Sequence, residues 1–368
     1  MGNYREVRQA SRVVVSVFIA IALVYAVYFL PLPLYIFSAG TAETIQPMVQ
    51  THQTGAQERG TFMLTTVRVS SASVFSYLLS LVQPYDELRS KGELLRDNES
   101  EQEYTQRQEV SMLTSQSSAI EAAYHKLGIP YHIRNDGVVV MQLFRDFPAY
   151  EVLRPGDSIV QVDDTPVRRT EELLELLKER QAGDAVKIDY KRGDEMHSAE
   201  IKLAVLPTAD GTTGEQQRAP RAGLGIVSVN VQSIQADDPK HQVTITAGEI
   251  GGPSAGLMFA LEIVNRLTPE DITKGYKIAG TGTIDAQGEV GVIGGIQHKI
   301  IAADKAGAEI FFAPKDYTAP NGQIIPNFSA AEERAKDIQS RMKVVPVGTI
   351  DDALQYLSVL PPKAAANG

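Results

Sequence analysis

An apolar run near the N-terminus constrains this chain more than any other feature. Residues 13–30 form eighteen consecutive positions without a charged side chain, which approaches the length needed to cross a bilayer as a helix. Three arginines precede the run, and the next basic residue after it is Arg59. Because basic flanks stay in the cytoplasm, we expect a transmembrane anchor over residues 13–36, with a cytoplasmic N-terminus and an extracytoplasmic body. The alternative is a cleaved signal peptide, although the apolar core is long for one.

The composition narrows the chemistry that the chain can perform. Its 368 residues include 35 basic and 45 acidic side chains, for a net charge of −10, which argues against a nucleic-acid partner. Cysteine is absent, which excludes disulfides, thiolate metal sites and a cysteine nucleophile. The six histidines do not have the spacing of metal ligands, and we expect neither a metal nor a cofactor. Any catalysis must therefore use hydroxyls, amines and carboxylates.

The segment after the apolar run gives weaker indications of its structure. Residues 41–59 are polar and rich in glutamine, which is typical of a spacer. Residues 61–69 are rich in β-branched and apolar side chains and predict a strand. Apolar side chains at helical spacing predict a helix over residues 109–127, which Gly128 would end.

From Gly137 the pattern changes to short strands separated by turns. Val138, Val139 and Val140 belong to a buried-strand run, and a Pro-Gly-Asp turn precedes a second, alternating strand. A leucine-rich helix and two more strands follow. Residues 125–206 thus resemble a PDZ domain of the bacterial protease type.

This resemblance implies peptide binding. PDZ domains bind an extended peptide as an added strand between one edge of their sheet and a helix. The resemblance assigns that role to Gly137, Val138, Val139 and Val140. The Gly-Leu-Gly-Phe loop that captures C-terminal carboxylates is replaced by Asn-Asp-Gly-Val at residues 135–138, so internal peptide segments are also possible ligands. The alternative is a small β-rich domain without a peptide groove.

A second informative segment passes from a strand through Gly251, Gly252 and Pro253 into a helix, with Ser254 at its entry. A serine at this place is most often a cap for the free amides of the helix. The functional alternative is a nucleophile, because glycines let a substrate approach and the helix end could stabilise an oxyanion. Pro253 has no N–H, so the amide donors would come from Gly252 or from Ser254 itself.

A base for that serine would have to be an amine, and Lys299 is the candidate. Read as a helix, residues 294–307 place Lys299 on the same apolar face as Ile296, whereas Lys305 lies off that face as an ordinary surface lysine. A lysine on an apolar face usually extends its ammonium to water. If it cannot, burial lowers its pKa and leaves a neutral amine that can take a proton. The neighbouring His298 points about 100° away around the helix and is a weaker candidate.

Thr281 ends another strand before a glycine-rich turn. Its hydroxyl could orient the amine of Lys299, although a threonine at a strand end needs no functional explanation. No G-x-x-x-x-G-K-[ST] segment occurs in the chain, so the sequence carries no P-loop for ATP.

Together these segments resemble the proteolytic domain of Lon proteases. The run Gly-Pro-Ser-Ala-Gly around Ser254 is similar to the signature of the Lon nucleophile, and the run Gly-Gly-Ile-Gln-His-Lys ending at Lys299 is similar to the segment with its dyad lysine. Thr281 falls on the active-site threonine of that family. The resemblance covers residues 225–360 and implies a Ser254–Lys299 dyad, supported by Thr281 and Gly252.

Nearly the whole chain, from Thr61 onward, resembles the YlbL/SepM-type membrane-anchored Lon-like proteases, which combine an anchor, a PDZ domain and a Lon domain without an ATPase module. The resemblance implies that the strand over 61–69 and the helix over 109–127 belong to the protease domain, with the PDZ domain inserted. It also implies self-association, since Lon relatives form rings. One departure is Gly251, where several Lon enzymes have an aspartate, and Glu249 could take over part of that role.

The sequence therefore predicts an α+β multidomain protein with an N-terminal transmembrane helix, a PDZ domain and a Lon-type α+β proteolytic domain. We expect an ATP-independent serine endopeptidase at the cell membrane that cleaves extracytoplasmic peptides and proteins presented by its PDZ domain. The alternative is a non-catalytic, membrane-tethered PDZ adaptor with a Lon-like fold. The predicted divisions are a cytoplasmic N-terminus (1–12), the anchor (13–36), a membrane-proximal region (37–124), the PDZ domain (125–206), a linker (207–222), the proteolytic domain (223–360) and a disordered tail (361–368).

Overall fold

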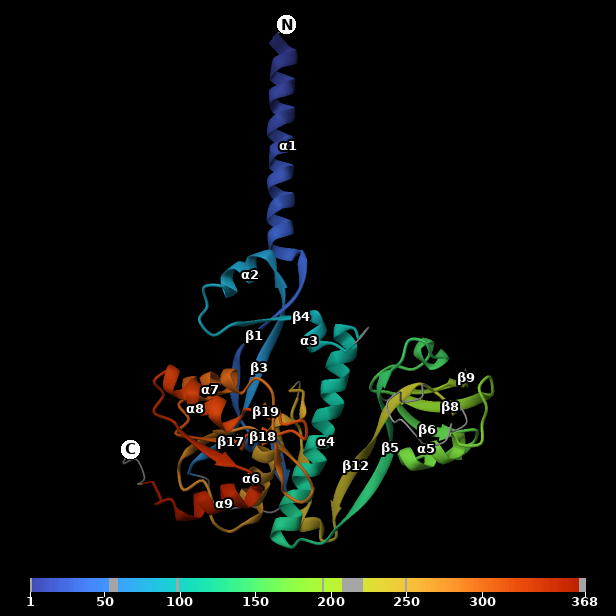
Figure 1. Ribbon diagram of the computed structural model, residues 1–368, viewed down its shortest axis with the longest axis vertical. Helices are drawn as coiled ribbons and strands as arrows, with labels where there is room; N and C mark the ends of the chain where they lie inside the picture. Colours follow the sequence, from blue (N-terminus) through green and yellow to red (C-terminus); the bar gives the residue numbers. More distant parts are fainter. Residues whose placement is uncertain are drawn as a thin grey trace.

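Helix α1 (Gly2–Phe29) stands apart from the body of the protein and projects from one end of it (Figure 1). Apolar side chains along the helix, such as those of Phe18 and Leu23, are exposed. No helix among the described residues reaches the combined length and hydropathy expected of a membrane span. The computed structural model describes residues 2–52, 59–96, 99–193, 195–206, 221–248 and 250–363.

The predicted anchor extends too far, because residues 31–36 are not helical. Pro31 and Pro33 lack the N–H group that a helix needs and disfavour helical geometry in the residues before them. Strand β1 (Pro31–Thr44) begins there instead, and Tyr35 and Ile36 are buried in the body. The apolar side chains after the prolines therefore belong to the folded body.

A six-stranded sheet forms the centre of the larger domain, in the order β20-β17-β14-β3-β1-β4. Strands β14, β17 and β20 are parallel, β3 pairs in parallel with β14, and β1 pairs antiparallel with both β3 and β4. The strands besides β1 are β3 (Thr61–Ser73), β4 (Glu87–Ser90), β14 (Lys277–Gly280), β17 (Ile310–Pro314) and β20 (Lys343–Val347).

Helices cover both faces of this sheet, as the strand sequences require. Side chains alternate between the faces along a strand, and in β3 the consecutive residues Phe62, Met63 and Leu64 are all buried. Phe62 and Leu64 pack in one core with α4 (Glu101–Leu127), α6 (Gly256–Leu267) and α9 (Ile350–Val359). Met63 packs in a second core with α7 (Ile296–Lys305) and α8 (Phe328–Asp337).

The segment predicted as a spacer, residues 41–59, belongs to the fold as far as it is described. After β1, the chain forms η1 (Gln46–Met48) and then β2 (Val49–Thr51), which pairs with β13 (Val243–Ile245). Ile45 and Val49 are buried in the main core. A few apolar side chains thus fix a mostly polar segment, and residues 53–58 lie outside the described part.

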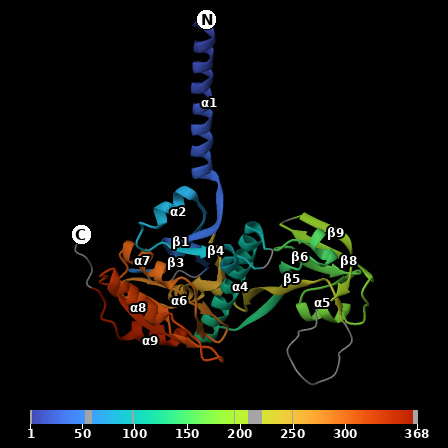
Figure 2. The same ribbon diagram turned by 45° about the horizontal axis from the view of Figure 1, so that its top comes forward.

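A second sheet with its own core forms a smaller domain beside α4 (Figure 2). Its order is β12-β5-β6-β8-β9, with β7 (Thr165–Pro166) paired to β6. Helix α5 (Thr170–Leu177) buries Leu173 and Leu177 in this core. The strands are β5 (Tyr131–Leu143), β6 (Ser158–Val162), β8 (Ala185–Arg192), β9 (Glu195–Lys202) and β12 (Ile226–Ala236).

Strand β12 corrects the predicted start of the proteolytic domain at residue 223. Its residues 226–231 pair with residues 137–143 of β5 inside the smaller sheet, and the remainder pairs with the first half of β5. Leu224 is buried in the core of the smaller domain. The smaller domain is therefore completed by residues after the predicted linker, and the sequence does not mark the boundary because β12 is one continuous strand.

The predicted linker and tail are described only at their ends. β10 (Ala204–Val205) pairs with β11 (Ala222–Gly223). Residues 207–220 of the predicted linker and residues 364–368 of the predicted tail lie outside the described residues.

In the chain, the smaller domain separates elements of one sheet. β1, β3 and α4 precede it, whereas β14, β17 and β20 follow it, yet β3 and β14 pair directly. The remaining short elements are α2 (Val74–Ser80), α3 (Lys91–Leu94), η2 (Pro148–Glu151), η3 (Pro239–His241), η4 (Pro253–Ala255), β15 (Thr283–Ile284), β16 (Val290–Gly291), β18 (Tyr317–Thr318) and β19 (Ile324–Ile325).

Candidate active site

Ser254 lies in the turn η4, immediately before α6. Gly252 has a φ of +87° and a ψ of 157°, a conformation that favours glycine. A Cβ added to Gly251 or to Gly252 would lie 2.9 Å from side-chain atoms of Gln108 on α4. The two glycines therefore allow the serine loop to pack directly against this helix.

Lys299 projects from α7 toward Ser254. Its Nζ lies 2.9 Å from Oγ of Ser254 and donates a hydrogen bond of 2.5 Å to the backbone carbonyl of Thr65 on β3. The Lys299 side chain is 4% exposed, and this burial lowers the pKa of Lys299 to about 7. A substantial fraction of the amine is therefore neutral near pH 7 and can accept a proton from the serine hydroxyl.

Thr281 has a different contact from the predicted one. Its Oγ1 donates a hydrogen bond of 2.9 Å to the backbone carbonyl of Ser254, and the Gly282 N–H donates to the same oxygen at 2.8 Å. Thr281 is fully buried. It therefore holds the backbone of Ser254, and the carbonyl of Thr65 is the group that orients the lysine amine.

Two residues of α4, one through its backbone and one through its side chain, complete the support of the serine loop, and sequence reasoning missed both. The carbonyl of Gln108 accepts a hydrogen bond of 2.8 Å from the Gly252 N–H, and the Ser115 hydroxyl donates to the carbonyl of Pro253 at 2.9 Å. The Gly252 N–H is thus occupied, so the predicted role of Gly252 as an amide donor is wrong in this conformation. Glu249, considered as a further support, lies outside the described residues.

Ser254 and Lys299 open onto a cavity of about 620 Å³. Its walls come from β1 and β3, from the N-terminal half of α4 and from the serine loop. Apolar side chains such as Phe37, Val67 and Met112 line it together with Arg89 and Tyr104. A cavity of this size, lined by apolar side chains together with polar groups, is typical of a ligand-binding site.

His298, the weaker candidate for a base, turns away from the serine. Its side chain is 3% exposed, and its Nε2 lies 3.4 Å from a carboxylate oxygen of Glu87 on β4. Burial lowers the pKa of His298, and Glu87 opposes that shift. Within the described part of the chain, no group of three His, Asp or Glu side chains is placed to hold a metal ion.

The residues predicted to bind a peptide lie inside the smaller sheet. Val138 and Val139 on β5 pair with β12 on one side and with β6 on the other. Gly137 and Val140 are part of the same strand and also pair with β12. Because both edges of this segment are occupied, the prediction that Gly137, Val138, Val139 and Val140 receive a peptide strand is wrong.

The edge strand next to helix α5 is β12. The N–H and hydroxyl of Thr170, the first residue of α5, both donate to the side-chain carbonyl of Asn230, at 2.7 and 2.8 Å. The residues that lead into β12 are Gly223-Leu224-Gly225-Ile226, with Gly225 at a φ of +69°. This run has the Gly-Leu-Gly-apolar pattern that PDZ domains carry in their carboxylate-binding loop and that residues 135–138 lack. The sequence-based prediction did not find it, because the run follows residue 206, the predicted end of the PDZ domain.

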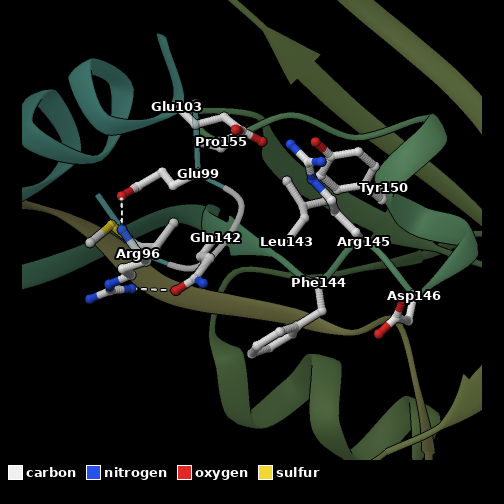
Figure 3. Close-up of a pocket in the computed structure, with 11 residues that line it drawn as sticks. Arg96, Glu99, Glu103, Gln142, Leu143, Phe144, Arg145, Asp146, Tyr150 and Pro155 are labelled. Carbon is white, nitrogen blue, oxygen red and sulfur yellow. Dashed lines mark hydrogen bonds between the residues drawn. The ribbon is translucent and has the colours of Figure 1, made fainter. Parts of the chain in front are cut away.

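A second cavity, of about 370 Å³, lies where the N-terminal end of α4 meets β5 (Figure 3). Glu99 accepts two hydrogen bonds from Arg107, at 2.7 and 2.9 Å, and a third from the N–H of Arg96. The guanidinium of Arg96 reaches across to Gln142 on β5. This cavity therefore belongs to the junction of the two domains and not to the site of Ser254.

Comparisons with known proteins find a family match for the smaller domain and another for the larger domain. Residues 125–203 match the family model of the PDZ domain, and residues 240–359 match that of the Lon protease (S16) C-terminal proteolytic domain. The chain contains a PDZ domain and a Lon-type serine peptidase domain. Strand β12, which completes the PDZ sheet, lies outside the matched PDZ residues.

Individual relatives cover the same parts. The Lon protease of Trichlorobacter lovleyi is 34% identical over 115 residues, 31% of this chain and 13% of that protein. That of Vibrio parahaemolyticus is 33% identical over 156 residues, 40% of this chain and 18% of that protein. The chain thus spans less than a fifth of the length of these curated relatives. A crystal structure of the PDZ domain of an SdrC-like protein from Listeria monocytogenes is 33% identical and covers 26% of this chain and 90% of that chain, with a TM-score of 0.23.

The Lon-type domain departs from several Lon enzymes at Gly251, and its packing gives a physical reason. The space that a side chain at position 251 would need is filled by Gln108 of α4. An aspartate there would push the serine loop away from the helix. The hydrogen bond from Gly252 to Gln108 and that from Ser115 to Pro253 support the loop in its place.

Proposed function

We propose that the chain is an ATP-independent serine endopeptidase in which Ser254 is the nucleophile and Lys299 the general base. The observation that carries the proposal is the 2.9 Å separation of Ser254 Oγ and Lys299 Nζ in a buried site. A neutral amine at that distance can take the hydroxyl proton while Oγ attacks a peptide carbonyl. The reaction then needs neither a histidine nor a metal.

The same amine serves the later steps. After attack, the ammonium of Lys299 gives its proton to the nitrogen of the departing peptide, which leaves an ester between Ser254 and the acyl half of the substrate. Lys299, neutral again, takes a proton from water as the water attacks the ester and returns that proton to Ser254. The Thr65 carbonyl, 2.5 Å from Nζ, stabilises the ammonium that exists between these transfers.

The oxyanion formed during attack would face the N-terminal end of α6. This end carries the partial positive charge of the helix dipole and amides without a helical partner. Since the Gly252 N–H is bound to Gln108, the donors would come from Ser254 and the residues after it. Thr281 and Gly282 contribute by fixing the Ser254 carbonyl, which sets the direction of that helix end.

Substrates of this site would be extended and flexible. The sequence has no P-loop for an ATP-driven unfolding step, so the chain would cleave peptides, tails and unfolded segments. We place the docking of such segments on the edge of β12, next to α5, as an added strand. The loop at Gly225 then offers backbone amides for a terminal carboxylate, with internal segments as weaker ligands.

We also propose that α1 anchors the protein in the cell membrane, with the catalytic body outside the cytoplasm. The uncharged run of residues 13–30, the arginines before it and the exposed apolar side chains of α1 support this placement. The helix projects away from the body, so its apolar side chains have no core of their own to enter (Figure 1). An anchor would raise the effective concentration of substrates in the same membrane.

Cleavage of an unstructured peptide by purified protein tests the dyad. We expect Ser254→Ala and Lys299→Ala each to lower kcat/KM by roughly 10³-fold or more. Lys305→Ala, which removes an exposed lysine from the same helix, should leave cleavage unchanged, and a chelator should have no effect. Full activity of Lys299→Ala would reject Lys299 as the base, and full activity of Ser254→Ala would reject Ser254 as the nucleophile.

A further inference from the structure

An uncharged segment lies at the end of the body from which α1 projects. Residues 70–85 contain no Asp, Glu, Lys or Arg and include helix α2. In and after this helix, Leu78, Leu81 and Val82 are 56%, 60% and 74% exposed. Adjacent exposed apolar side chains without an intervening charge are costly in water and indicate a surface that is covered by something else.

This surface continues that of α1. The ring of Phe75 on α2 stacks on Tyr28 of α1, with centroids 4.5 Å apart and an angle of 20° between the planes. Phe29 and Leu30, at the same end of α1, are themselves exposed. Both views of the molecule show α2 beside the base of α1 (Figures 1 and 2).

We propose that residues 74–82 form a lipid-contacting face that lies in the boundary between headgroups and acyl chains beside α1. This inference rests on the proposed anchoring of α1 and adds a second membrane contact to it. Lipid is the occupant that fits, because the apolar surface runs without a break onto a helix whose exposed apolar residues point in all directions. A protein partner would have to enclose both helices to cover the same side chains.

The consequence is a fixed orientation of the active site. A single helical anchor would let the body rotate, whereas a second contact at α2 holds one end of it against the membrane. β1 and β3 lead from α1 and α2 into the main sheet, and Phe37 and Val69 on these strands line the cavity of Ser254. The cavity is then held at a set height, which favours substrate segments close to the membrane surface.

The absence of tryptophan from the chain gives a direct experiment. Single tryptophans are introduced in the full chain as Leu78→Trp on α2, Phe18→Trp on α1 and Val359→Trp on α9, all at exposed positions. Each variant is reconstituted in vesicles of phosphatidylcholine and phosphatidylglycerol, with and without brominated acyl chains. Emission maximum and quenching by bromine report contact with lipid.

We expect Leu78→Trp to emit at a shorter wavelength than Val359→Trp and to lose at least half of its intensity in brominated vesicles. Emission from Leu78→Trp that matches Val359→Trp would overturn the lipid-contacting face, and a blue shift without quenching would overturn it in favour of a protein contact. Phe18→Trp decides the anchor separately: its quenching supports α1 as a membrane helix, and its failure to be quenched rejects the anchor whatever Leu78→Trp shows.

Discussion

At the scale of single residues, the properties of Lys299 follow from the groups that surround its amine. The side chain leaves α7 on the apolar face, cannot reach water and meets a backbone carbonyl and a hydroxyl. Neither partner carries a full charge, so little compensates the ammonium for its lost hydration, and the pKa of Lys299 falls from 10.5 to about 7. Burial that is unfavourable for folding thus produces the neutral amine that the proposed chemistry needs.

The pH dependence of cleavage should report this amine. Because the neutral form of Lys299 is the base, kcat/KM should rise as pH increases through about 7 and then level off. The profile is measured with an uncharged peptide between pH 5 and 11. A rise centred near the ordinary lysine value of 10.5 would mean that the amine is not desolvated in the working enzyme.

Removing the amine should make the fold more stable. A pKa that is lower in the folded state means that the unfolded chain binds the proton more tightly, so the buried lysine destabilises the fold below pH 10.5, and most strongly below pH 7. The difference between 10.5 and about 7 corresponds to roughly 4 kcal/mol at neutral pH. We expect Lys299→Met to unfold at a higher denaturant concentration than the parent at pH 7, with the gap closing toward pH 10.5. A Lys299→Met variant less stable than the parent at pH 7 would contradict this account.

The sequence could predict Ser254 and Lys299 but not the groups that position them. A serine between glycines and a helix, and a lysine on an apolar helical face, are visible in local patterns. Thr65 and Gln108 act through backbone carbonyls, which every residue possesses, so side-chain identity gives no signal. Thr281 could be selected from the sequence, but its partner, the Ser254 carbonyl, depends on how two distant segments meet.

At the scale of elements, β12 shows how one strand can belong to two domains. Its first half completes the PDZ sheet, and its second half, paired with the start of β5, contacts α4 of the peptidase domain. Sequence alone could predict the strand but not its partner, because pairing between distant segments leaves no local pattern. The edge available to a peptide was therefore assigned to β5, which the structure places in the interior of the sheet.

The proposed role of the loop before β12 in peptide binding can be tested by substituting two glycines, one in this loop and one elsewhere. Gly225 and Gly193 both have positive φ, at 69° and 60°, so an alanine strains either backbone by a similar amount. A Cβ on Gly225 would lie 2.0 Å from the ring of Phe147, whereas one on Gly193 would meet nothing within 4 Å. We expect Gly225→Ala in a Ser254→Ala background to weaken peptide binding by at least tenfold and Gly193→Ala to leave it unchanged. Equal affinities in a fluorescence anisotropy titration would argue against docking at β12.

At the scale of the whole molecule, the parts of the fold occupy separate places. α1 and α2 lie at one end, the six-stranded sheet lies below them, and the PDZ domain lies to the side beyond α4 (Figure 1). The sequence could predict the presence of these parts from a long apolar run and two sets of motifs. It could not predict that residues 31–36 and 41–52 join the body, because a few buried side chains in a proline-containing or polar segment resemble a linker until their partners are known.

Removal of α1 should leave the cleavage of free peptides unchanged and slow only the cleavage of membrane-tethered peptides. The proposed catalytic pair lies far from α1 in sequence and is held by α4, β3 and α7, so a chain starting at residue 31 should cleave a free peptide with unchanged kcat/KM. Cleavage of the same peptide tethered to vesicles should fall by about 10²-fold, because the proposed anchor would raise the effective concentration of enzyme and substrate in one membrane. Loss of free-peptide cleavage would show that α1 has a structural role in the site.

The most direct measurement of the central claim is the titration of Lys299 itself. In protein carrying ¹³C at the Cε of lysine, the Lys299 resonance can be assigned by comparison with Lys299→Met and followed by nuclear magnetic resonance from pH 5 to 11. A resonance that titrates near pH 7 is the result that a desolvated base beside Ser254 predicts. A resonance that titrates with the surface lysines above pH 10 would contradict the account.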